Sequence, residues 1–431
     1  MVARSSFKWQ WRAVSRRAIL GAIGTASASF LLSRIVLAAA SERADRVKAL
    51  LNEYVLNKKV AGAVAVVGTH ESSKFVSSGH IALEHGAANA DPDSLWRIYS
   101  MTKLVTGAAA MLLIEDGKLT LDTPIAEIFP TFGSPKVLID PGTSQTRPAK
   151  SAITVRHLMT HTSGLVGSMV PEPPLSTFYA DRKLNVSRVS LEDDSKVHHQ
   201  TSLLAYAAAA GTVPLAFDPG TQWSYSISSD VLGGVIEKVS GMPFEFFLET
   251  RIFHPLGMID TRFTVSADKL TRFATNYQVT SEGLKAIDAP PHTIFAEPPP
   301  FPYPSSGLVS SARDFARFMG MLLGEGALSG SRVLTAQTAR LMMSNLLPAG
   351  VRASGQGWGA GGSVLLASTG AATPLGMTPG TYGWEGSAGT VAWVDRVTGV
   401  YAVLMTQYMP SAAYNFHADF TAAIFADLSK H

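Results

Sequence analysis

The sequence predicts a mixed α/β (α+β) fold, in which one antiparallel sheet flanked by helices is assembled from both ends of the chain. Two short apolar runs bounded by turn residues, 62–68 and 74–79, predict a first pair of strands. A second pair, 390–394 and 400–405, surrounds a turn that ends at Gly399. The long stretch between the two pairs is rich in helical patterns, so we expect it to form an inserted, mostly helical domain.

Helices near both ends of the chain are expected to cover this sheet. Residues 43–58 place Val47, Leu51 and Tyr54 at the spacing of one helical face. A second helix is predicted over residues 412–428. With 431 residues and a hydrophobic content of 46%, the chain is long enough to bury a large core.

The first 40 residues have the pattern of an export signal. A paired arginine, Arg16-Arg17, precedes an apolar segment, and the small residues 38–40 provide a cleavage site. The pair resembles a twin-arginine signal, which makes the twin-arginine export machinery an expected partner and the periplasm or the exterior the expected location. Arg34 interrupts the apolar segment and leaves it too short to span a bilayer. An uncleaved anchor and a disordered start are the alternatives.

The charge pattern argues against a nucleic-acid-binding function. Residues 1–40 carry six of the 36 basic residues and none of the 33 acidic ones, so the rest of the chain has three more acidic than basic residues. No basic footprint for nucleic acid remains there. The chain has no cysteine, which excludes disulfides, thiol nucleophiles and cysteine-ligated metals. No segment after the leader is expected to span a membrane.

The stretch Ser100-Met-Thr-Lys103 is the main candidate for catalysis. It opens an uncharged apolar run, 104–114, which predicts a buried helix. Positions three apart share a helix face, so the amine of Lys103 is expected beside the hydroxyl of Ser100. A serine is a weak nucleophile until an adjacent base activates it, and a lysine serves as that base where its surroundings favour the neutral amine. Serine at a helix start is also a common N-cap residue.

The spacing alone is not specific, because Ser5-Ser-Phe-Lys8 and Ser266-Ala-Asp-Lys269 fit it as well. The first of these lies in the expected leader, and the second is not followed by a buried helix. Only Ser100 therefore has the context that the chemistry requires.

Two further segments carry candidate groups. Tyr225 stands just before a helical pattern at 231–239, where it could relay a proton, although a tyrosine there is also common in a core. Trp384-Glu-Gly-Ser387 is expected to open the strand at 390–394. There the backbone N–H groups of Ser387 and Ser100 could donate to an oxyanion, and Gly386 would let a ligand approach closely. Taken alone, this segment is an ordinary glycine-rich turn.

In this order, the segments resemble the serine β-lactamase and penicillin-binding superfamily, and are most similar to the class C β-lactamases and the family VIII carboxylesterases. The resemblance runs from about residue 45 to the end of the chain. The segments that carry it are Leu95-Trp-Arg-Ile-Tyr-Ser-Met-Thr-Lys103, Gly117-Lys-Leu-Thr-Leu-Asp-Thr-Pro-Ile125, Ile153-Thr-Val-Arg-His-Leu-Met-Thr-His-Thr-Ser-Gly-Leu165 and Ser306-Gly-Leu-Val-Ser-Ser-Ala-Arg-Asp-Phe315.

The resemblance implies a role for each candidate residue. Ser100 would be the acylated nucleophile, and Lys103 and Tyr225 would act together as the base. The N–H groups of Ser100 and Ser387 would form the oxyanion hole. No cofactor and no metal is implied.

The resemblance also implies a domain division. A β-lactamase-like serine hydrolase domain would cover 41–431, after a signal at 1–40. Its sheet subdomain would span about 41–98 and 305–431, its helical subdomain about 99–304, and the site would lie between the two.

Two departures from the family pattern favour an ester as substrate. Ile227 stands where β-lactamases have the asparagine of Tyr-x-Asn, and Trp384 stands where they have the lysine of Lys-Thr-Gly. A β-lactam carries a carboxylate that pairs with a cation, which tryptophan cannot supply. With Gly386, these two residues are therefore expected to line a pocket for the acyl or alcohol group of a small ester.

Other functions and residues stay open. A β-lactamase, D,D-peptidase or D-aminopeptidase would use the same site, and a non-catalytic cell-wall-binding protein would keep the scaffold without turnover. His157 and His161 have the spacing of a metal pair but lack the carboxylate of the usual motif, and His198-His199 is expected to be solvated. The proline-rich stretch 289–304 has two interpretations. Its residues Phe295, Phe301 and Tyr303 are apolar enough to line a pocket, or the stretch is a rigid surface connector. Neither the oligomeric state nor the exact ester follows from the sequence.

Overall fold

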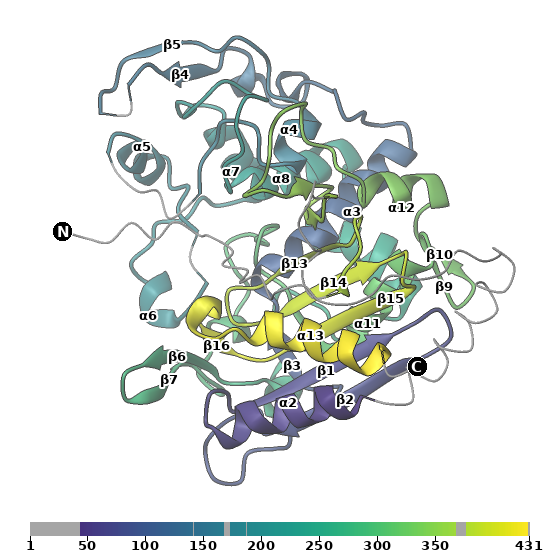
Figure 1. The fold of residues 1–431 in the computed structure, drawn as a ribbon. Coiled ribbons are helices and arrows are strands. Elements are labelled where there is room, and N and C mark those ends of the chain that lie inside the picture. Colours follow the sequence, from purple (N-terminus) through teal and green to yellow (C-terminus); the bar gives the residue numbers. More distant parts are fainter. Residues whose placement is uncertain (1–43, 141, 168–172, 187, 368–375, 430–431) are drawn as a thin grey trace, which may run out of the picture.

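The computed structural model describes residues 44–140, 142–167, 173–186, 188–367 and 376–429 (Figure 1). Its centre is a seven-stranded sheet in which neighbouring strands are antiparallel throughout. In spatial order the strands are β11 (Gly357–Trp358), β12 (Ser363–Val364), β13 (Tyr382–Glu385), β14 (Val391–Asp395), β15 (Val400–Met405), β1 (Gly62–Gly68) and β2 (Ser73–Gly79).

Strands from the two halves of the chain are neighbours in this sheet. Strand β1 pairs with β15, and Val66 lies opposite Val403 in the register. This confirms the expected fold class and the sheet built from both termini. One expectation is wrong, because Trp384 does not open the strand at 390–394. It lies in a separate strand, β13, and the turn 386–390 follows that strand.

Alternating side chains of the central strands pack into two separate cores, one on each face of the sheet. In β1, Ala63 and Ala65 face the helices α2 (Asp45–Leu56) and α13 (Phe416–Leu428), which cover one face of the sheet (Figure 1). Val64 and Val66 face the opposite side and join the largest core. Successive residues of a strand point to opposite faces, so a strand that is buried throughout reads as a continuous apolar run. The opposite core includes α11 (Ala312–Leu323).

The region between the sheet segments is mostly helical, as expected. Helix α3 (Thr102–Glu115) runs through its core and is buried from Thr102 to Leu113. The other helices are α4 (Val155–Met159), α5 (Leu175–Asp181), α6 (Leu191–Asp194), α7 (Leu203–Ala210), α8 (Ser228–Ser240), α9 (Phe244–Leu248), α10 (His254–Leu256) and α12 (Ala336–Met342).

Small sheets complete the fold. Strand β3 (Leu95–Arg97) pairs with β8 (Val309–Ser311), β4 (Lys136–Leu138) with β5 (Thr146–Pro148), and β9 (Ala327–Leu328) with β10 (Ser331–Arg332). A fourth small sheet has three strands, since β6 (Asn276–Thr280) pairs with both β7 (Gly283–Asp288) and β16 (Tyr408–Met409).

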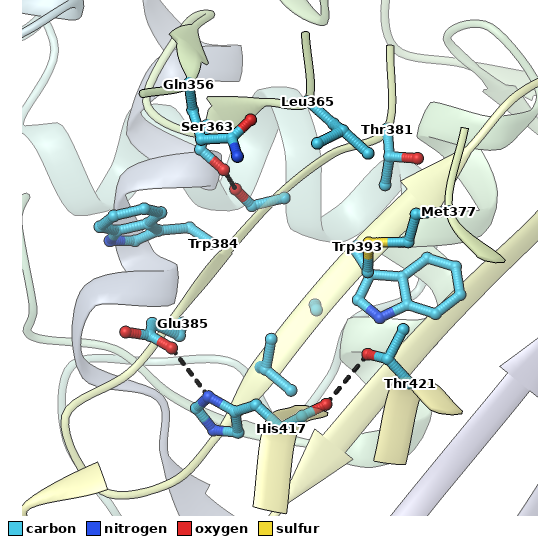
Figure 2. Close-up of a pocket in the computed structure, with 13 residues that line it drawn as sticks. Gln356, Ser363, Leu365, Met377, Thr381, Trp384, Glu385, Trp393, His417 and Thr421 are labelled. Atoms are coloured by element: carbon cyan, nitrogen blue, oxygen red, sulfur yellow. Dashed lines mark hydrogen bonds and ion pairs between the residues drawn. The ribbon is translucent and has the colours of Figure 1, made fainter. Parts of the chain in front are cut away.

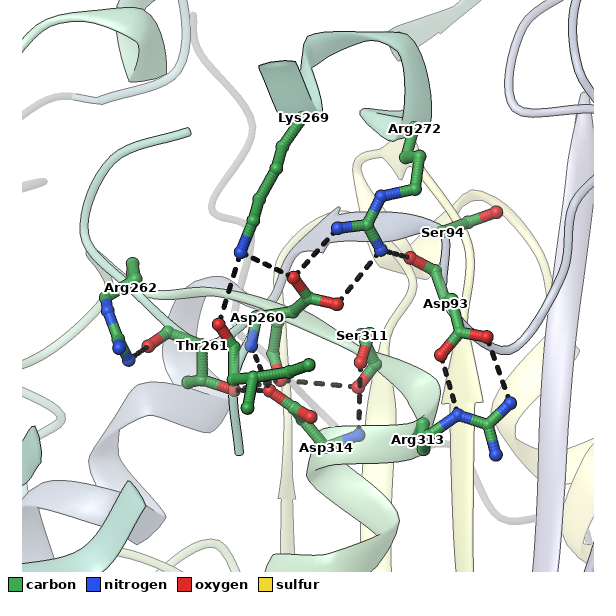
Figure 3. A network of polar contacts seen from close by, with 12 residues as sticks. Asp93, Ser94, Asp260, Thr261, Arg262, Lys269, Arg272, Ser311, Arg313 and Asp314 are labelled. Atoms are coloured by element: carbon green, nitrogen blue, oxygen red, sulfur yellow. Dashed lines mark hydrogen bonds and ion pairs between the residues drawn. The ribbon is translucent and has the colours of Figure 1, made fainter. Parts of the chain in front are cut away.

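A polar network holds β3 in place (Figure 3). The carboxylate of Asp260 accepts hydrogen bonds from Lys269 at 2.8 Å and from Arg272 at 2.8 and 2.9 Å. Arg272 also donates to the backbone oxygen of Asp93 at 2.7 Å, and the Asp93 carboxylate pairs with Arg313 of α11. Asp93 stands two residues before β3, which leads directly to Ser100, so this network fixes the approach to the candidate nucleophile.

One expectation about side chains is wrong, and another is narrowed. Phe295, Phe301 and Tyr303 are at most 4% exposed, so these three side chains pack in the interior. His199 is not solvated, because its ring lies 3.0 Å from the Asp194 carboxylate and 3.1 Å from the Tyr303 hydroxyl.

The expected leader, residues 1–40, lies outside the described residues. Within the described ranges, no helix has both the length and the apolar character of a membrane span.

Candidate active site

Ser100 lies in a short 3₁₀ turn, Tyr99–Met101, between β3 and the start of α3. The residue before it, Tyr99, is buried and has a φ of +41°, a backbone conformation that non-glycine residues rarely adopt. Strain of this kind persists only where the surrounding structure holds it, and it is concentrated at functional sites. Ser100 itself is partly exposed.

Lys103 points at the Ser100 hydroxyl. Its Nζ is 3.1 Å from Ser100 Oγ and donates a second hydrogen bond to the backbone oxygen of Ser305 at 2.8 Å. The amine also lies 4.5 Å from the ring centroid of Tyr225. Lys103 is only 3% exposed, so its amine is held by these partners rather than by solvent.

A buried carboxylate holds the backbone that binds the Lys103 amine. Asp230, in the first turn of α8, accepts the backbone N–H of Ser305 at 2.9 Å. The backbone N–H and C=O of Ser305 therefore connect Asp230 with Lys103. Burial raises the pKa of Asp230, while the charge of Lys103 and the hydrogen bond from Ser305 act in the opposite direction.

Tyr225 is oriented by Trp384. The indole N–H of Trp384 donates to the Tyr225 hydroxyl at 3.0 Å, and the two ring centroids are 5.6 Å apart. Trp358 packs against the Trp384 ring at 4.5 Å, nearly perpendicular to it, and Trp223 lies 6.2 Å from Tyr225. These four rings form an aromatic wall beside the serine–lysine pair.

The end of β13 reaches the turn that carries Ser100. A Cβ built on Gly386 would lie 2.5 Å from the backbone oxygen of Ile98 and 2.2 Å from Thr390 Oγ1, so no other residue fits there without a shift. The next residue, Ser387, is exposed, and its carbonyl accepts the Ser411 N–H at 3.0 Å. In the described part of the chain no acceptor bonds the Ser387 N–H.

The structure thus brings Ser100, Lys103, Tyr225 and Trp384 together, with Gly386 and Ser387 at the end of the adjacent strand. Ile227 is 2% exposed and belongs to the core beneath them.

Three residues of the site were not singled out for it by the sequence. Asp230 directly precedes the helical pattern at 231–239, and Ser305 directly follows the proline-rich stretch 289–304, but nothing in their spacing shows that they meet. His161 had the spacing of a metal pair with His157, whereas the structure packs its ring 4.8 Å from that of Tyr225.

A second pocket lies beside β13, and Trp384 of the candidate site is among the residues that line it (Figure 2). Its lining includes Trp393, Met377 and Leu365, and at one end His417 pairs with Glu385 at 2.7 Å. Ser100, Lys103 and Tyr225 do not line it. It is mostly apolar and contains no nucleophile–base pair, so the candidate chemistry belongs to the Ser100 side. No set of three or more metal-ligating side chains gathers anywhere in the described ranges.

Comparison with known proteins places this chain in a family. The Beta-lactamase family model matches residues 45–426. Protein Rv1367c of Mycobacterium tuberculosis is 33% identical over 368 residues, which cover 81% of this chain and 86% of that protein. Esterase EstB of Burkholderia gladioli is 29% identical over 385 residues, which cover 85% and 91%.

Solved structures share the fold. EstCE1, described as a hydrolase with promiscuous acyltransferase activity, superimposes with a TM-score of 0.72 at 23% identity, over 92% of this chain and all of that one. Simvastatin synthase LovD of Aspergillus terreus gives a TM-score of 0.74 at 22% identity, over 89% and 98%.

The chain belongs to the Beta-lactamase family of serine hydrolases and related enzymes. The expectations that it is an enzyme of this class and that it has the family's fold are confirmed.

Proposed function

We propose that this protein is a serine carboxylesterase acting on small uncharged esters through an acyl-enzyme on Ser100. The observation that carries the proposal is the hydrogen bond from the neutral Trp384 indole to Tyr225, beside a lysine amine 3.1 Å from Ser100 Oγ. A nucleophile and a base are present, and the group that meets the rest of the substrate is an aromatic ring without charge. This favours an ester over a substrate whose carboxylate needs a cation.

The proposed reaction passes through an acyl-enzyme. The Ser100 oxygen attacks the ester carbonyl carbon while its proton passes to the Lys103–Tyr225 pair. The carbonyl oxygen becomes an oxyanion, which the N–H groups of Ser100 and Ser387 stabilise. The C–O bond to the alcohol then breaks, and the pair returns the proton to the leaving oxygen. Water attacks the acyl group in the same way and releases the acid, which restores the Ser100 hydroxyl.

The names of several relatives support ester chemistry of this kind. EstB is named an esterase, and a relative from Penicillium decumbens, 25% identical over 77% of this chain, is named an acyltransferase. An acyl-enzyme that water hydrolyses can also pass its acyl group to an alcohol. Acyl transfer is therefore the second candidate activity of the same site.

Export is part of this proposal. The paired arginines at 16–17, the apolar segment after them and the alanines at 38–40 support cleavage near residue 40 and release into the periplasm or the medium. Mass spectrometry of the protein recovered from the periplasm or medium tests this, and residues 1–40 retained there would contradict it.

The function is tested by the hydrolysis of p-nitrophenyl butyrate by residues 41–431. Ser100→Ala should lower kcat by at least about a thousandfold, the scale expected when a covalent nucleophile is lost. Ser266→Ala, in the other described Ser-x-x-Lys sequence, is the matched control and should keep full activity. Turnover of a chromogenic cephalosporin without ester hydrolysis would favour a β-lactamase, and no turnover of either substrate would favour a binding protein.

A further inference from the structure

His161 lies directly behind Tyr225. It follows α4 in a short connection, its side chain is completely buried, and its φ is +57°. This left-handed conformation is unfavourable for most residues other than glycine, so the neighbouring contacts must hold it.

His161 accepts hydrogen bonds from the backbone on both sides of Tyr225. The N–H of Ser224 donates to the backbone oxygen of His161 at 3.0 Å. The N–H of Ser226 donates to His161 Nδ1 at 3.2 Å, and the Ser226 hydroxyl oxygen is 3.0 Å from the same nitrogen. One residue thus holds the two amides that flank the tyrosine, while its ring packs against the tyrosine ring at a tilt of 37°.

The hydrogen bonds define the state of the ring. Because Nδ1 accepts an N–H, the proton of the neutral imidazole is on Nε2. That nitrogen is buried without a hydrogen-bond partner in the described part of the chain, and the rings of Trp358 and Trp223 stand nearly perpendicular to the imidazole. Burial lowers the pKa of His161 well below its ordinary value, and the charge of Lys103 lowers it further. The imidazole is therefore a neutral acceptor rather than a proton carrier.

We propose that His161 is the positioning residue of the base: it sets where the Tyr225 hydroxyl lies relative to Ser100 and Lys103. The inference rests on the role proposed above for Tyr225. Without the Nδ1 acceptor, the amide of Ser226 would be left buried and unpaired, which is costly unless the segment moves. A shift of the tyrosine by a fraction of an ångström would slow proton transfer and would leave the Trp384 ring in the site.

Two substitutions separate this role from simple packing. His161→Phe keeps a planar ring and removes the acceptor. His161→Asn offers a carbonyl oxygen to the Ser226 N–H, and asparagine tolerates a positive φ. If His161→Phe does not yield folded protein, His161→Leu, close in size to asparagine and without an acceptor, takes its place. His157→Asn is the control, because the ring of His157 caps α4 through Thr154 and not the tyrosine segment.

The measurement is kcat and KM for p-nitrophenyl butyrate at a temperature where all variants are folded. We expect His161→Phe to lower kcat about tenfold or more, with KM within about twofold, because a mispositioned base affects the transition state rather than binding. His161→Asn should recover kcat to within about threefold of the wild type, and His157→Asn should match the wild type.

The role of His161 is wrong if the acceptor-free variant keeps wild-type kcat, or if the asparagine variant loses as much as that variant. A second readout separates this failure from failure of the proposed function. If the wild type does not hydrolyse the ester, the rate at which a fluorophosphonate modifies Ser100 is compared across the same variants. That rate depends on the base but not on a particular ester, and the same order of variants is expected.

Discussion

The indole N–H of Trp384 donates to the hydroxyl of Tyr225 at 3.0 Å, across the gap between strand β13 and the segment that precedes helix α8. One side chain thus does two things: it fixes the phenol of the proposed base, and it places a neutral aromatic surface in the site. This relationship connects the proposed mechanism with the proposed preference for uncharged esters.

Removing this hydrogen bond should slow turnover. Trp384→Phe keeps an aromatic ring but loses the N–H, so we expect kcat/KM for p-nitrophenyl butyrate to fall about tenfold, the effect of about 1.4 kcal/mol in the transition state. Trp393→Phe is the matched control, since the Trp393 indole N–H has no partner within the described ranges and lies on the other face of the sheet. Equal losses in the two variants would argue against a role for the Trp384 bond.

Gly386 lies so close to the turn that carries Ser100 that a methyl side chain should not fit at this position. The added Cβ would meet the Ile98 carbonyl at 2.5 Å, and this contact would push the segment of the proposed oxyanion hole away from Ser100. We expect Gly386→Ala to lower kcat about a hundredfold, the scale of losing one oxyanion donor.

Gly142→Ala provides the comparison, because a Cβ there would meet its nearest atom at 3.6 Å. Steady-state kinetics of both variants make the test. Near-wild-type kcat for Gly386→Ala would show that the position of this segment is not critical.

The Glu385–His417 pair should make stability depend on pH. Burial alone lowers the pKa of His417, but the hydrogen bond and charge of Glu385 outweigh it, so the pKa is raised above its ordinary value of about 6.5. A raised histidine pKa contributes stability that is fully present below about pH 6.5 and is lost as the pH rises through the folded-state value.

We therefore expect His417→Gln to lower the melting temperature most at pH 6 and progressively less toward pH 9. Thermal unfolding of both proteins across this range measures the difference. A difference that is constant with pH would mean that the imidazolium charge does not stabilise the fold.

The sequence predicted the sheet and the long helix well because their signals are local. The apolar run of β1 and the uncharged run after Lys103 each specify burial through their own composition, and the structure buries both. The short strands were harder, since β13 has four residues with a glycine among them and is defined by its pairing with β14.

Local geometry predicted the site only where one segment carries two of its groups, and Tyr225 and Trp384 were added to it by the family resemblance. Ser100 and Lys103 are three residues apart, so helix geometry alone places them together. The contacts from Asp230 through Ser305 to Lys103 and from His161 to Tyr225 join segments more than 60 residues apart. Whether these segments meet depends on the tertiary packing of the whole chain, which the sequence of one segment does not determine.

The most direct test of this account is the site at which a covalent inhibitor attaches. The protein is treated with a fluorophosphonate, digested and analysed by peptide mass spectrometry. The account predicts a single adduct on Ser100, which is absent in Ser100→Ala and retained in Ser266→Ala. An adduct on another residue, or none on Ser100, would contradict the proposal that this serine is the nucleophile.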